Sequence, residues 1–596
     1  MSRAGGEAEL PLPNPRPEGR VVRVLVDEPA IDKAFDYLVP DAFGGQVRVG
    51  DRVRVALGPR RVGGWVVEVG VEPPVGIDLR PLARWSGRGP GPDLIELARW
   101  AAWRWAGRPA SFLRTASPER NVAGLPPAAP VPAPRSAVDP RDRLHRLAED
   151  ALGRGRAVLR LPPAVDPGVV ALAAARRGHA LVLCPTAPAA AAVARTLQRA
   201  GVRVAGLPRG WALGAAGATV VGTRAAAWAP VGGLAAVVVV DEHDEAHQQE
   251  QAPTWHARDV ALERAYRAGV PCVLTSPCPS LEALAESPVL VPSRADERAG
   301  WPVVDVVDMR REDPRTGLLP PALVRVLRSG HRVLCVLNRT GRARLLACRA
   351  CGELARCERC DAAVSQPDDD ELRCARCGAS RPVVCAACGA TRMKALRQGV
   401  TRVRDEIEAL VGEPVAEVTG ARPADGDAGL TRVVVGTEAL LHQVGAADVV
   451  AFLDFDQELL APRYRAAEQA FGLVARAARL VGGKAGGGRL VLQTFIPRHE
   501  VVQAALHADP ARVAAAERDR RELLRFPPTT ALAEVSGAAA PAFVDALGAP
   551  PGVEVIGPAD GRWLVRAPDH AALCDALART ARPPGRLRVA VDPPRV

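Results

Sequence analysis

Eight cysteines form four Cys-x-x-Cys pairs within residues 348–388, and their spacing is the clearest chemical pattern in the sequence. The pairs are Cys348/Cys351, Cys357/Cys360, Cys374/Cys377 and Cys385/Cys388. A gap of two residues lets both sulfurs of a pair face one point, and two pairs supply the four tetrahedral thiolates of a structural zinc site. The sequence therefore predicts two Zn²⁺ ions. Because cysteine fills every ligand position, we expect the metal to be structural rather than catalytic.

The alternative for these cysteines is a disulfide scaffold. Disulfides persist in oxidising compartments, and the amino terminus lacks the basic and apolar segments of a secretory signal peptide. The sequence also contains no uncharged apolar run long enough to span a bilayer. We therefore expect a cytoplasmic protein with no membrane partner, whose reduced thiols are available to metal.

Length and charge limit what the chain can be. At 596 residues it is too long for one hydrophobic core, and we expect about three to five domains. Basic residues exceed acidic ones by 11, which indicates a polyanionic partner such as nucleic acid. Almost all of the positive charge is arginine, whose planar fork suits phosphate. Codon bias in a GC-rich genome is the alternative explanation for the arginines.

The amino-terminal part of the chain changes character several times. Residues 1–19 are rich in Pro, Glu and Gly, and we expect a disordered tail. Residues 20–90 alternate apolar and polar positions between Gly and Pro breaks, which predicts a small antiparallel β domain. Residues 91–122 carry apolar residues at helical spacing. Residues 123–140 are a Pro/Ala-rich linker that marks a domain boundary.

The rest of the chain predicts two α/β lobes. In residues 141–295, continuous apolar runs alternate with helical segments, as is typical of a parallel sheet covered on both faces. A second set begins in residues 296–345, is interrupted by the cysteine-rich residues 346–392, and continues over residues 393–500. Residues 501–596 are expected to form an α+β domain. The predicted fold class is therefore multidomain α/β. Two α/β lobes in tandem are the architecture of superfamily 2 helicases.

In this order the segments resemble the PriA family of primosomal replication-restart proteins. The resemblance runs from Val21 to Pro594 and depends on the cysteine cluster, on "VVVVDEHDEAHQQEQAPTWHARDVAL" and on "RRELLRFPPTTALA". Asp241, Glu242 and His243 match the family's Walker B segment, "DEEHD". Shorter matches are "VVGTRAAAWAPVGGL", "VLNRTG" and "VVVGTEALL".

The resemblance implies functions for the amino-terminal segments. It implies that the β domain binds the 3′ end of a nascent DNA strand and that residues 91–122 are a winged helix. The implied pocket residues are Phe35, Asp36 and Tyr37, with Gly50 in the following turn. An aromatic ring can stack on a terminal base, and a carboxylate can accept a hydrogen bond from the 3′-hydroxyl. The alternative is a half-buried strand with an exposed aspartate.

The resemblance also implies a nested arrangement of the metal ligands. The outer four cysteines, Cys348, Cys351, Cys385 and Cys388, would bind one zinc ion. The inner four, Cys357, Cys360, Cys374 and Cys377, would bind the other. Spacing alone leaves the consecutive pairing open.

Several segments depart from the family's motor motifs. In place of the phosphate-binding "GVTGSGKTE" the chain has "RLPPAVDPGVVAL" at Arg160 to Leu172, with prolines that lack donors and with Asp166. One glutamate of the Walker B segment is missing, and "GSATPS" and "QVAGRAGR" read "TSPCPS" and "RAARLVGG". From these changes we predict that ATP is not a cofactor, that the degenerate Walker B residues Asp241, Glu242 and His243 are not catalytic, and that the chain is not an enzyme.

The predicted function is recognition of stalled or abandoned replication forks and assembly of the primosome, so that the replicative helicase is reloaded. The implied partners are forks, D-loop-like branched DNA, single-stranded DNA, the replicative helicase and its loader, other primosome proteins and single-stranded DNA-binding protein. One alternative is an active ATP-dependent 3′-to-5′ helicase, since Gly222, Thr223 and Arg224 still resemble motor residues. A zinc-ribbon transcription or RNA-processing factor would have no reason to carry the paired lobes.

Overall fold

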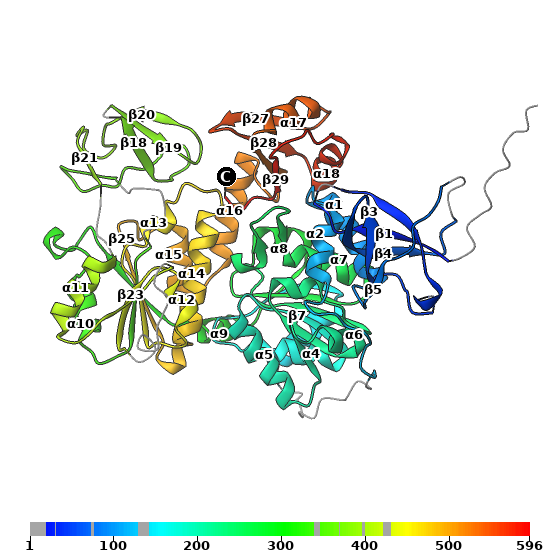
Figure 1. Cartoon of the computed structure of the whole chain (residues 1–596). Helices are drawn as coiled ribbons and strands as arrows, with labels where there is room; N and C mark the ends of the chain where they lie inside the picture. Colours follow the sequence, from blue (N-terminus) through cyan, green and yellow to red (C-terminus); the bar gives the residue numbers. More distant parts are fainter. Residues whose placement is uncertain are drawn as a thin grey trace, which may run out of the picture.

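The structure is a computed structural model that describes residues 20–595 except 30, 44, 73–76, 129–141, 339–345, 369, 396–399 and 421–430. The expected tail at residues 1–19 and most of the expected linker lie outside the described residues. Figure 1 shows the β domain at one end, the two lobes side by side, and the cysteine-rich and carboxy-terminal domains along one edge of the lobes. Among the described helices, none combines the length and apolar character needed to cross a bilayer.

The amino-terminal domain is a five-stranded antiparallel sheet covered on one side by two helices. Its strand order is β2-β1-β4-β3-β5. Valines that alternate along β1 fill the core inside the sheet, while Leu25 and Trp65 on the other face pack against the helices. The elements are β1 (Val21–Val26), β2 (Ala34–Leu38), η1 (Asp41–Phe43), β3 (Arg52–Leu57), β4 (Arg60–Val69), β5 (Arg84–Gly87), α1 (Pro92–Arg104) and α2 (Pro109–Ala116).

The first lobe is a seven-stranded sheet of order β14-β6-β13-β10-β7-β9-β8, and all of its strand pairs are parallel. Its central strands are buried on both faces, which explains their continuous apolar sequences. The strands are β6 (Arg156–Arg160), β7 (His179–Leu183), β8 (Val204–Gly206), β9 (Thr219–Gly222), β10 (Leu234–Val239), β13 (Cys272–Ser276) and β14 (Val289–Leu290), with a hairpin of β11 (Gln248–Gln249) and β12 (Trp255–His256). The helices are α3 (Arg143–Gly153), α4 (Gly168–Arg176), α5 (Ala187–Arg199), α6 (Trp211–Gly217), η2 (Arg224–Trp228), η3 (Glu245–His247), α7 (Ala257–Ala268), α8 (Leu281–Glu286) and α9 (Arg294–Ala299).

The second lobe is a six-stranded parallel sheet of order β15-β25-β24-β16-β23-β22. The long helix α14 lies between this sheet and the first lobe (Figure 1). The strands are β15 (Val303–Asp308), β16 (Val333–Val336), β22 (Ala416–Val418), β23 (Val433–Gly436), β24 (Val449–Phe452) and β25 (Arg489–Thr494). The helices are η4 (Pro314–Thr316), α10 (Pro321–Leu327), α11 (Val400–Val411), α12 (Leu440–Gln443), α13 (Asp456–Leu459), α14 (Ala466–Val481) and η6 (Lys484–Gly486).

Two smaller domains complete the chain. The cysteine-rich domain lies between β16 and α11 and pairs β17 (Leu346–Cys348) with β21 (Met393–Ala395), and β18 (Val364–Asp368) with β19 (Glu371–Cys374) and β20 (Ser380–Pro382). The carboxy-terminal part begins with α15 (Glu500–His507) and α16 (Ala511–Leu524). An antiparallel sheet of order β27-β28-β26-β29 follows, formed by β26 (Ala531–Ser536), β27 (Glu554–Ala559), β28 (Arg562–Ala567) and β29 (Arg588–Val591), with α17 (Ala540–Leu547) and α18 (His570–Arg579).

Candidate functional site

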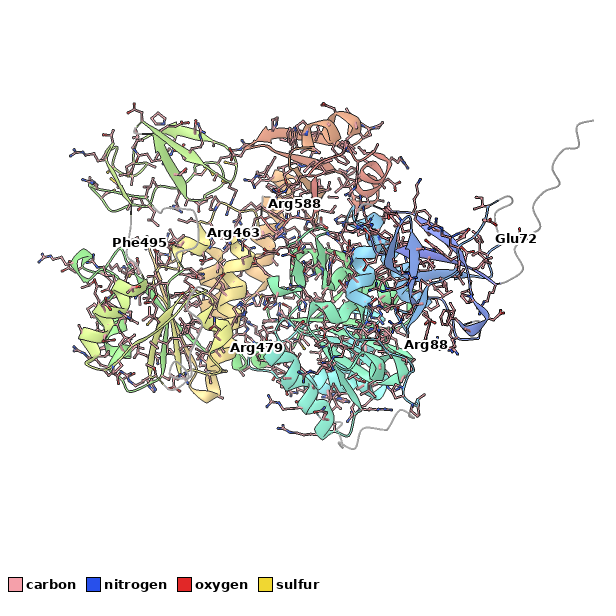
Figure 2. All side chains as sticks on the ribbon, viewed as in Figure 1. Glu72, Arg88, Arg463, Arg479, Phe495 and Arg588 are labelled. Carbon is pink, nitrogen blue, oxygen red and sulfur yellow. The ribbon has the colours of Figure 1, made fainter. Side chains whose placement is uncertain are left out.

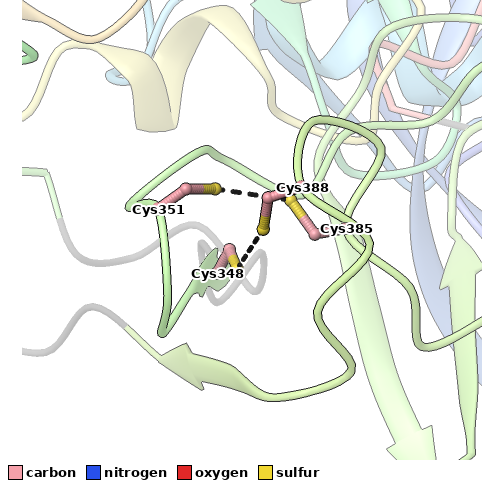
Figure 3. A group of neighbouring side chains, drawn as sticks. All are labelled: Cys348, Cys351, Cys385 and Cys388. Atoms are coloured by element: carbon pink, nitrogen blue, oxygen red, sulfur yellow. Dashed lines mark hydrogen bonds between the residues drawn. The ribbon is translucent and has the colours of Figure 1, made fainter.

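The outer cysteines Cys348, Cys351, Cys385 and Cys388 come together at one edge of the cysteine-rich domain (Figure 3). The sulfur atoms of Cys348 and Cys388 are 3.6 Å apart, as are those of Cys351 and Cys385. All four sulfurs lie within 4.8 Å of one another. Zn–S bonds of about 2.3 Å in a tetrahedron place sulfurs about 3.8 Å apart, so the spacing fits a zinc site.

The inner cysteines Cys357, Cys360, Cys374 and Cys377 form the second group. The Sγ atoms of Cys357 and Cys377 are 3.5 Å apart, and those of Cys360 and Cys374 are also 3.5 Å apart. The structure therefore has the nested arrangement rather than the consecutive one. Both groups consist of four thiols, so each donor set is complete without a water molecule and fits a structural metal ion.

Tight turns hold each pair in place. In the outer group, Gly352 N–H donates to the carbonyl of Cys348 and Gly389 N–H to that of Cys385. Gly352 has φ 78 and Gly389 has φ 75, a left-handed conformation that glycine adopts without steric cost. The Cys-x-x-Cys-Gly pattern is the sequence signal for this turn.

The predicted Walker B residues lie after the carboxyl end of β10, where the two lobes meet. Arg479 on α14 donates through NH2 to Oδ1 of Asp241 at 2.6 Å and through NH1 to the carbonyl of Val165 at 3.3 Å. Figure 2 labels Arg479 at this junction. Arg476, one turn earlier, pairs with Asp244. Burial acts to raise the pKa of Asp244, but Arg476, His243 and the amide of Ala246 together outweigh it and lower the pKa to about 2.

Glu242 and His243 form hydrogen bonds with the first lobe's own segments. Glu242 is fully buried and accepts hydrogen bonds from the amide and the hydroxyl of Ser280, both at 2.8 Å, while Arg258 NH1 lies 3.4 Å away. Burial raises the pKa of Glu242 against the opposing effects of Arg258 and Ser280. A hydrogen bond of 2.8 Å joins His243 Nδ1 to Ser276 Oγ. These contacts fix the "TSPCPS" segment against the end of β10.

The loop after β6 is the segment in which the sequence predicts a degenerate phosphate-binding motif. Its Asp166 carboxylate accepts a 2.8 Å hydrogen bond from the amide of Gly168, the first residue of α4. A carboxylate of the chain itself therefore faces the amino-terminal end of this helix, where anions bind favourably.

Sequence reasoning did not find the buried charge network around Arg521. This side chain of α16 pairs with Glu282 in the first lobe and with Glu468 on α14, and Arg465 also pairs with Glu282, at 2.6 Å. Tyr464 donates to the carbonyl of Pro593 at 3.3 Å. The network joins both lobes to the carboxy-terminal part. The phrase "RRELLRFPPTTALA" contains Arg521 and was the available signal.

A polar cavity of about 700 Å³ opens beside this network. Arginines of both lobes line it, namely Arg224, Arg463, Arg465 and Arg476. Figure 2 labels Arg463 on the second lobe. Arg463 pairs with Glu458 at 2.9 Å, so a strong anion would compete with internal carboxylates for these arginines.

The four predicted pocket residues have different surroundings in the structure. Phe35 and Tyr37 point into the core of the β domain, and Tyr37 donates to the carbonyl of Ala56 at 3.1 Å. Asp36 points to the opposite face, because successive residues of a strand alternate. Arg23 holds its carboxylate with two hydrogen bonds of 2.9 and 3.2 Å. The role of these residues in binding a 3′ end stays a prediction.

Gly50 serves a steric purpose in the turn before β3. It has φ 92, and a Cβ at this position would lie 1.8 Å from the carbonyl oxygen of Pro90. Only glycine fits here, so Gly50 allows the segment before α1 to lie close to the sheet.

Comparison with known proteins gives a consistent picture. Residues 23–118 match the family model described as the 3′DNA-binding domain (3′BD) of PriA. The probable replication restart protein PriA of Mycobacterium leprae (strain TN) is 30% identical over 93% of this chain and 93% of its own length. Replication restart protein PriA of Bacillus subtilis (strain 168) is 28% identical over 53% of this chain and 43% of its own. The chain thus aligns with less than half of the length of some relatives.

Among solved structures, the DUF1998 helicase MrfA bound to DNA is similar over 64% of this chain and 51% of its own, with a TM-score of 0.34 and 10% identity. The 3′BD match includes both α1 and α2. A boundary at residue 91 and a separate winged helix therefore remain predictions.

The prediction that this chain is not an enzyme is wrong. Both lobes contain a parallel sheet, and a relative named a probable replication restart protein matches 93% of the chain. Changes in motif segments do not demonstrate a loss of activity, so the enzyme interpretation stays open. With 30% identity to that relative over 93% of both sequences, the chain belongs to the PriA family of replication restart proteins.

Proposed function

We propose that this chain acts at stalled or abandoned replication forks, where it binds branched DNA and promotes reloading of the replicative helicase. The observation that carries this proposal is the match of residues 23–118 to the 3′DNA-binding domain. The excess of 11 basic residues is consistent with a DNA partner. The proposed protein partners are the helicase, its loader, other primosome proteins and single-stranded DNA-binding protein.

Asp36 is the proposed acceptor for the 3′-hydroxyl of a nascent strand. Its carboxylate is held in position by Arg23, and an ionised carboxylate offers more lone pairs than the two that this arginine occupies. A terminal hydroxyl approaching the outer face of β2 would therefore meet a fixed acceptor. Phe35, Tyr37 and Gly50 would support this strand and turn rather than contact the base.

Fork binding with a defined 3′ end tests this role. We would compare fluorescent forks that end in a 3′-hydroxyl or a 3′-phosphate at the junction. We expect binding to the hydroxyl fork to be about tenfold tighter, and Asp36→Asn to reduce this preference. Equal affinity for both forks in the unmodified chain would overturn the assignment.

The two cysteine groups are proposed to bind Zn²⁺. Four thiolates in a closed tetrahedral set favour zinc over oxygen-seeking cations such as Mg²⁺. Bound zinc would supply folding energy to a domain whose cores are small.

An ATP-dependent 3′-to-5′ helicase is the second candidate function. It is favoured by Asp241 and Glu242, which lie at the carboxyl end of β10 at the interface of the lobes. A Mg²⁺-nucleotide at this position would have to compete with Arg479 for Asp241. Single-turnover hydrolysis with fork DNA tests this function: turnover that Asp241→Asn abolishes would support it, and no turnover under these conditions would exclude it.

A further inference from the structure

Two arginines occupy equivalent positions in the inner cysteine group but have different surroundings. Arg359 lies in the turn Cys357-Glu-Arg-Cys360, and Arg376 lies in the turn Cys374-Ala-Arg-Cys377. Arg359 is exposed, whereas Arg376 is half-buried and its Nε atom is enclosed without a hydrogen bond. The difference arises because the second turn faces the second lobe.

Arg376 connects the inner group to that lobe. Its NH1 donates to the carbonyl of Cys360 at 3.0 Å, and its NH2 donates to the carbonyl of Ala461 at 2.9 Å. Beside it, the amide of Ala363 donates to the carbonyl of Leu460 at 2.7 Å. Ala461 lies between α13 and Tyr464, so the attached segment leads directly into α14.

No carboxylate of the described residues forms an ion pair with Arg376. A partly desolvated guanidinium that only contacts carbonyl groups is costly unless another negative charge lies nearby. Four thiolates around one divalent cation leave two net negative charges. The inner group is therefore a candidate counterion, since Arg376 lies in the turn between Cys374 and Cys377.

We propose that Arg376 is a positioning residue that links the inner metal centre to the second lobe. Its positive charge stabilises the four thiolates. The two terminal nitrogens of its guanidinium group hold the carbonyls of Cys360 and Ala461 at a fixed separation. The outer group has no equivalent, because the matching positions of its two turns hold Ala350 and Ala387. Occupancy of the inner centre then orders residues 460–465, from which Tyr464 and Arg465 contact the carboxy-terminal part and the first lobe. This inference rests on the proposed zinc occupancy.

The test compares three variants of the full-length chain with the unmodified protein. Arg376→Met removes both the charge and the paired donors of the guanidinium group. Arg376→Lys keeps the charge but not the paired donors. Arg359→Met is the matched control. Zinc content is measured first, followed by the rate of zinc transfer to a chromophoric chelator. Amide hydrogen exchange of residues 458–465 then reports the order of the attached segment.

We expect Arg376→Met to release one of the two zinc ions about 10–100-fold faster, as for other residues that orient metal ligands, and to exchange faster at residues 458–465. Arg376→Lys should retain near-normal zinc release but show the faster exchange. Arg359→Met should match the unmodified chain.

If Arg376→Met and Arg359→Met behave alike in a chain that holds two zinc ions, this inference alone fails. An unmodified chain with fewer than two zinc ions overturns the metal assignment as well. If Arg376→Met does not fold, exchange in Arg376→Lys equal to that of the unmodified chain still contradicts the inference.

Discussion

Arg479 of the second lobe donates a 2.6 Å hydrogen bond to Asp241 of the first lobe, 238 residues away in sequence. The same face of α14 carries Arg476, which pairs with Asp244, and Gln469, which donates to Glu245. Residues 469 and 476 are two helical turns apart and residues 476 and 479 are about one turn apart, so all three side chains lie on one side of the helix. One face of α14 therefore contacts most of the segment that follows β10.

Removing this contact should weaken the association of the lobes. Arg479→Ala leaves Asp241 without its cation, and hydrogen bonds to charged groups contribute about 1.5–3 kcal/mol. We expect a loss of this size in the free energy of unfolding, measured by urea denaturation. At high salt, small-angle scattering should also give a larger radius of gyration for Arg479→Ala than for the unmodified chain.

The matched control for this change is Arg489→Ala. Arg489 pairs with Asp305 at 2.7 Å inside the second lobe, and both side chains are more exposed. We expect little change in stability or radius from this control. Equal effects of the two substitutions would contradict a specific contribution of Arg479 to the lobe interface.

The stability of the carboxy-terminal domain should depend on pH, because His570 of α18 pairs with Asp592. Burial acts to lower the pKa of His570, but the Asp592 carboxylate, 2.9 Å from its Nε2, outweighs it and raises the pKa above the usual value. A raised histidine pKa contributes stability that is fully present below the unfolded pKa, about 6.5, and lost as pH rises through the folded value. His570→Gln should therefore lower the melting temperature more at pH 6 than at pH 8.5.

The control for this prediction is His331→Gln. His331 is 60% exposed beside Asp448, so we expect its substitution to have little effect at either pH. A His570→Gln penalty that does not change between pH 6 and pH 8.5 would show that the ring contributes through packing and not through its charge.

Gly50→Ala should destabilise the amino-terminal domain. The added Cβ would lie 1.8 Å from the carbonyl oxygen of Pro90, so the chain before α1 has to move. Gly58→Ala is the control, since Gly58 also has positive φ, at 59, but nothing lies within 4 Å of its added Cβ. We expect Gly58→Ala to cost about 1 kcal/mol of unfolding free energy and Gly50→Ala clearly more. Similar losses would mean that the turn relaxes without cost.

Local patterns in the sequence predicted the elements better than they predicted the contacts between them. The run "HALVL" is buried at every position of β7, as continuous apolar sequence indicates. The strand alternation that places Asp36 opposite Phe35 and Tyr37 is likewise readable from the sequence, as a period of two residues.

Long-range pairing could not be predicted from spacing. Arg359 and Arg376 have the same position in their turns, yet only Arg376 reaches a carbonyl of the second lobe, 85 residues away. Likewise, nothing local shows that Arg476 and Arg479 of α14 reach carboxylates of the first lobe. Such contacts depend on how the domains pack, and a single sequence carries no pattern for that packing.

The nested metal arrangement can be tested with two double variants that remove the same number of cysteines. Cys348→Ser with Cys385→Ser removes two ligands of the outer group alone, so we expect loss of one zinc ion and retention of the other. Cys348→Ser with Cys357→Ser removes one ligand from each group, and we expect both ions to be lost or weakly held. Zinc content after gel filtration in the presence of a mild chelator gives the count. Consecutive pairing predicts the reverse, because Cys348 and Cys357 would then share one ion while Cys348 and Cys385 would belong to different ions.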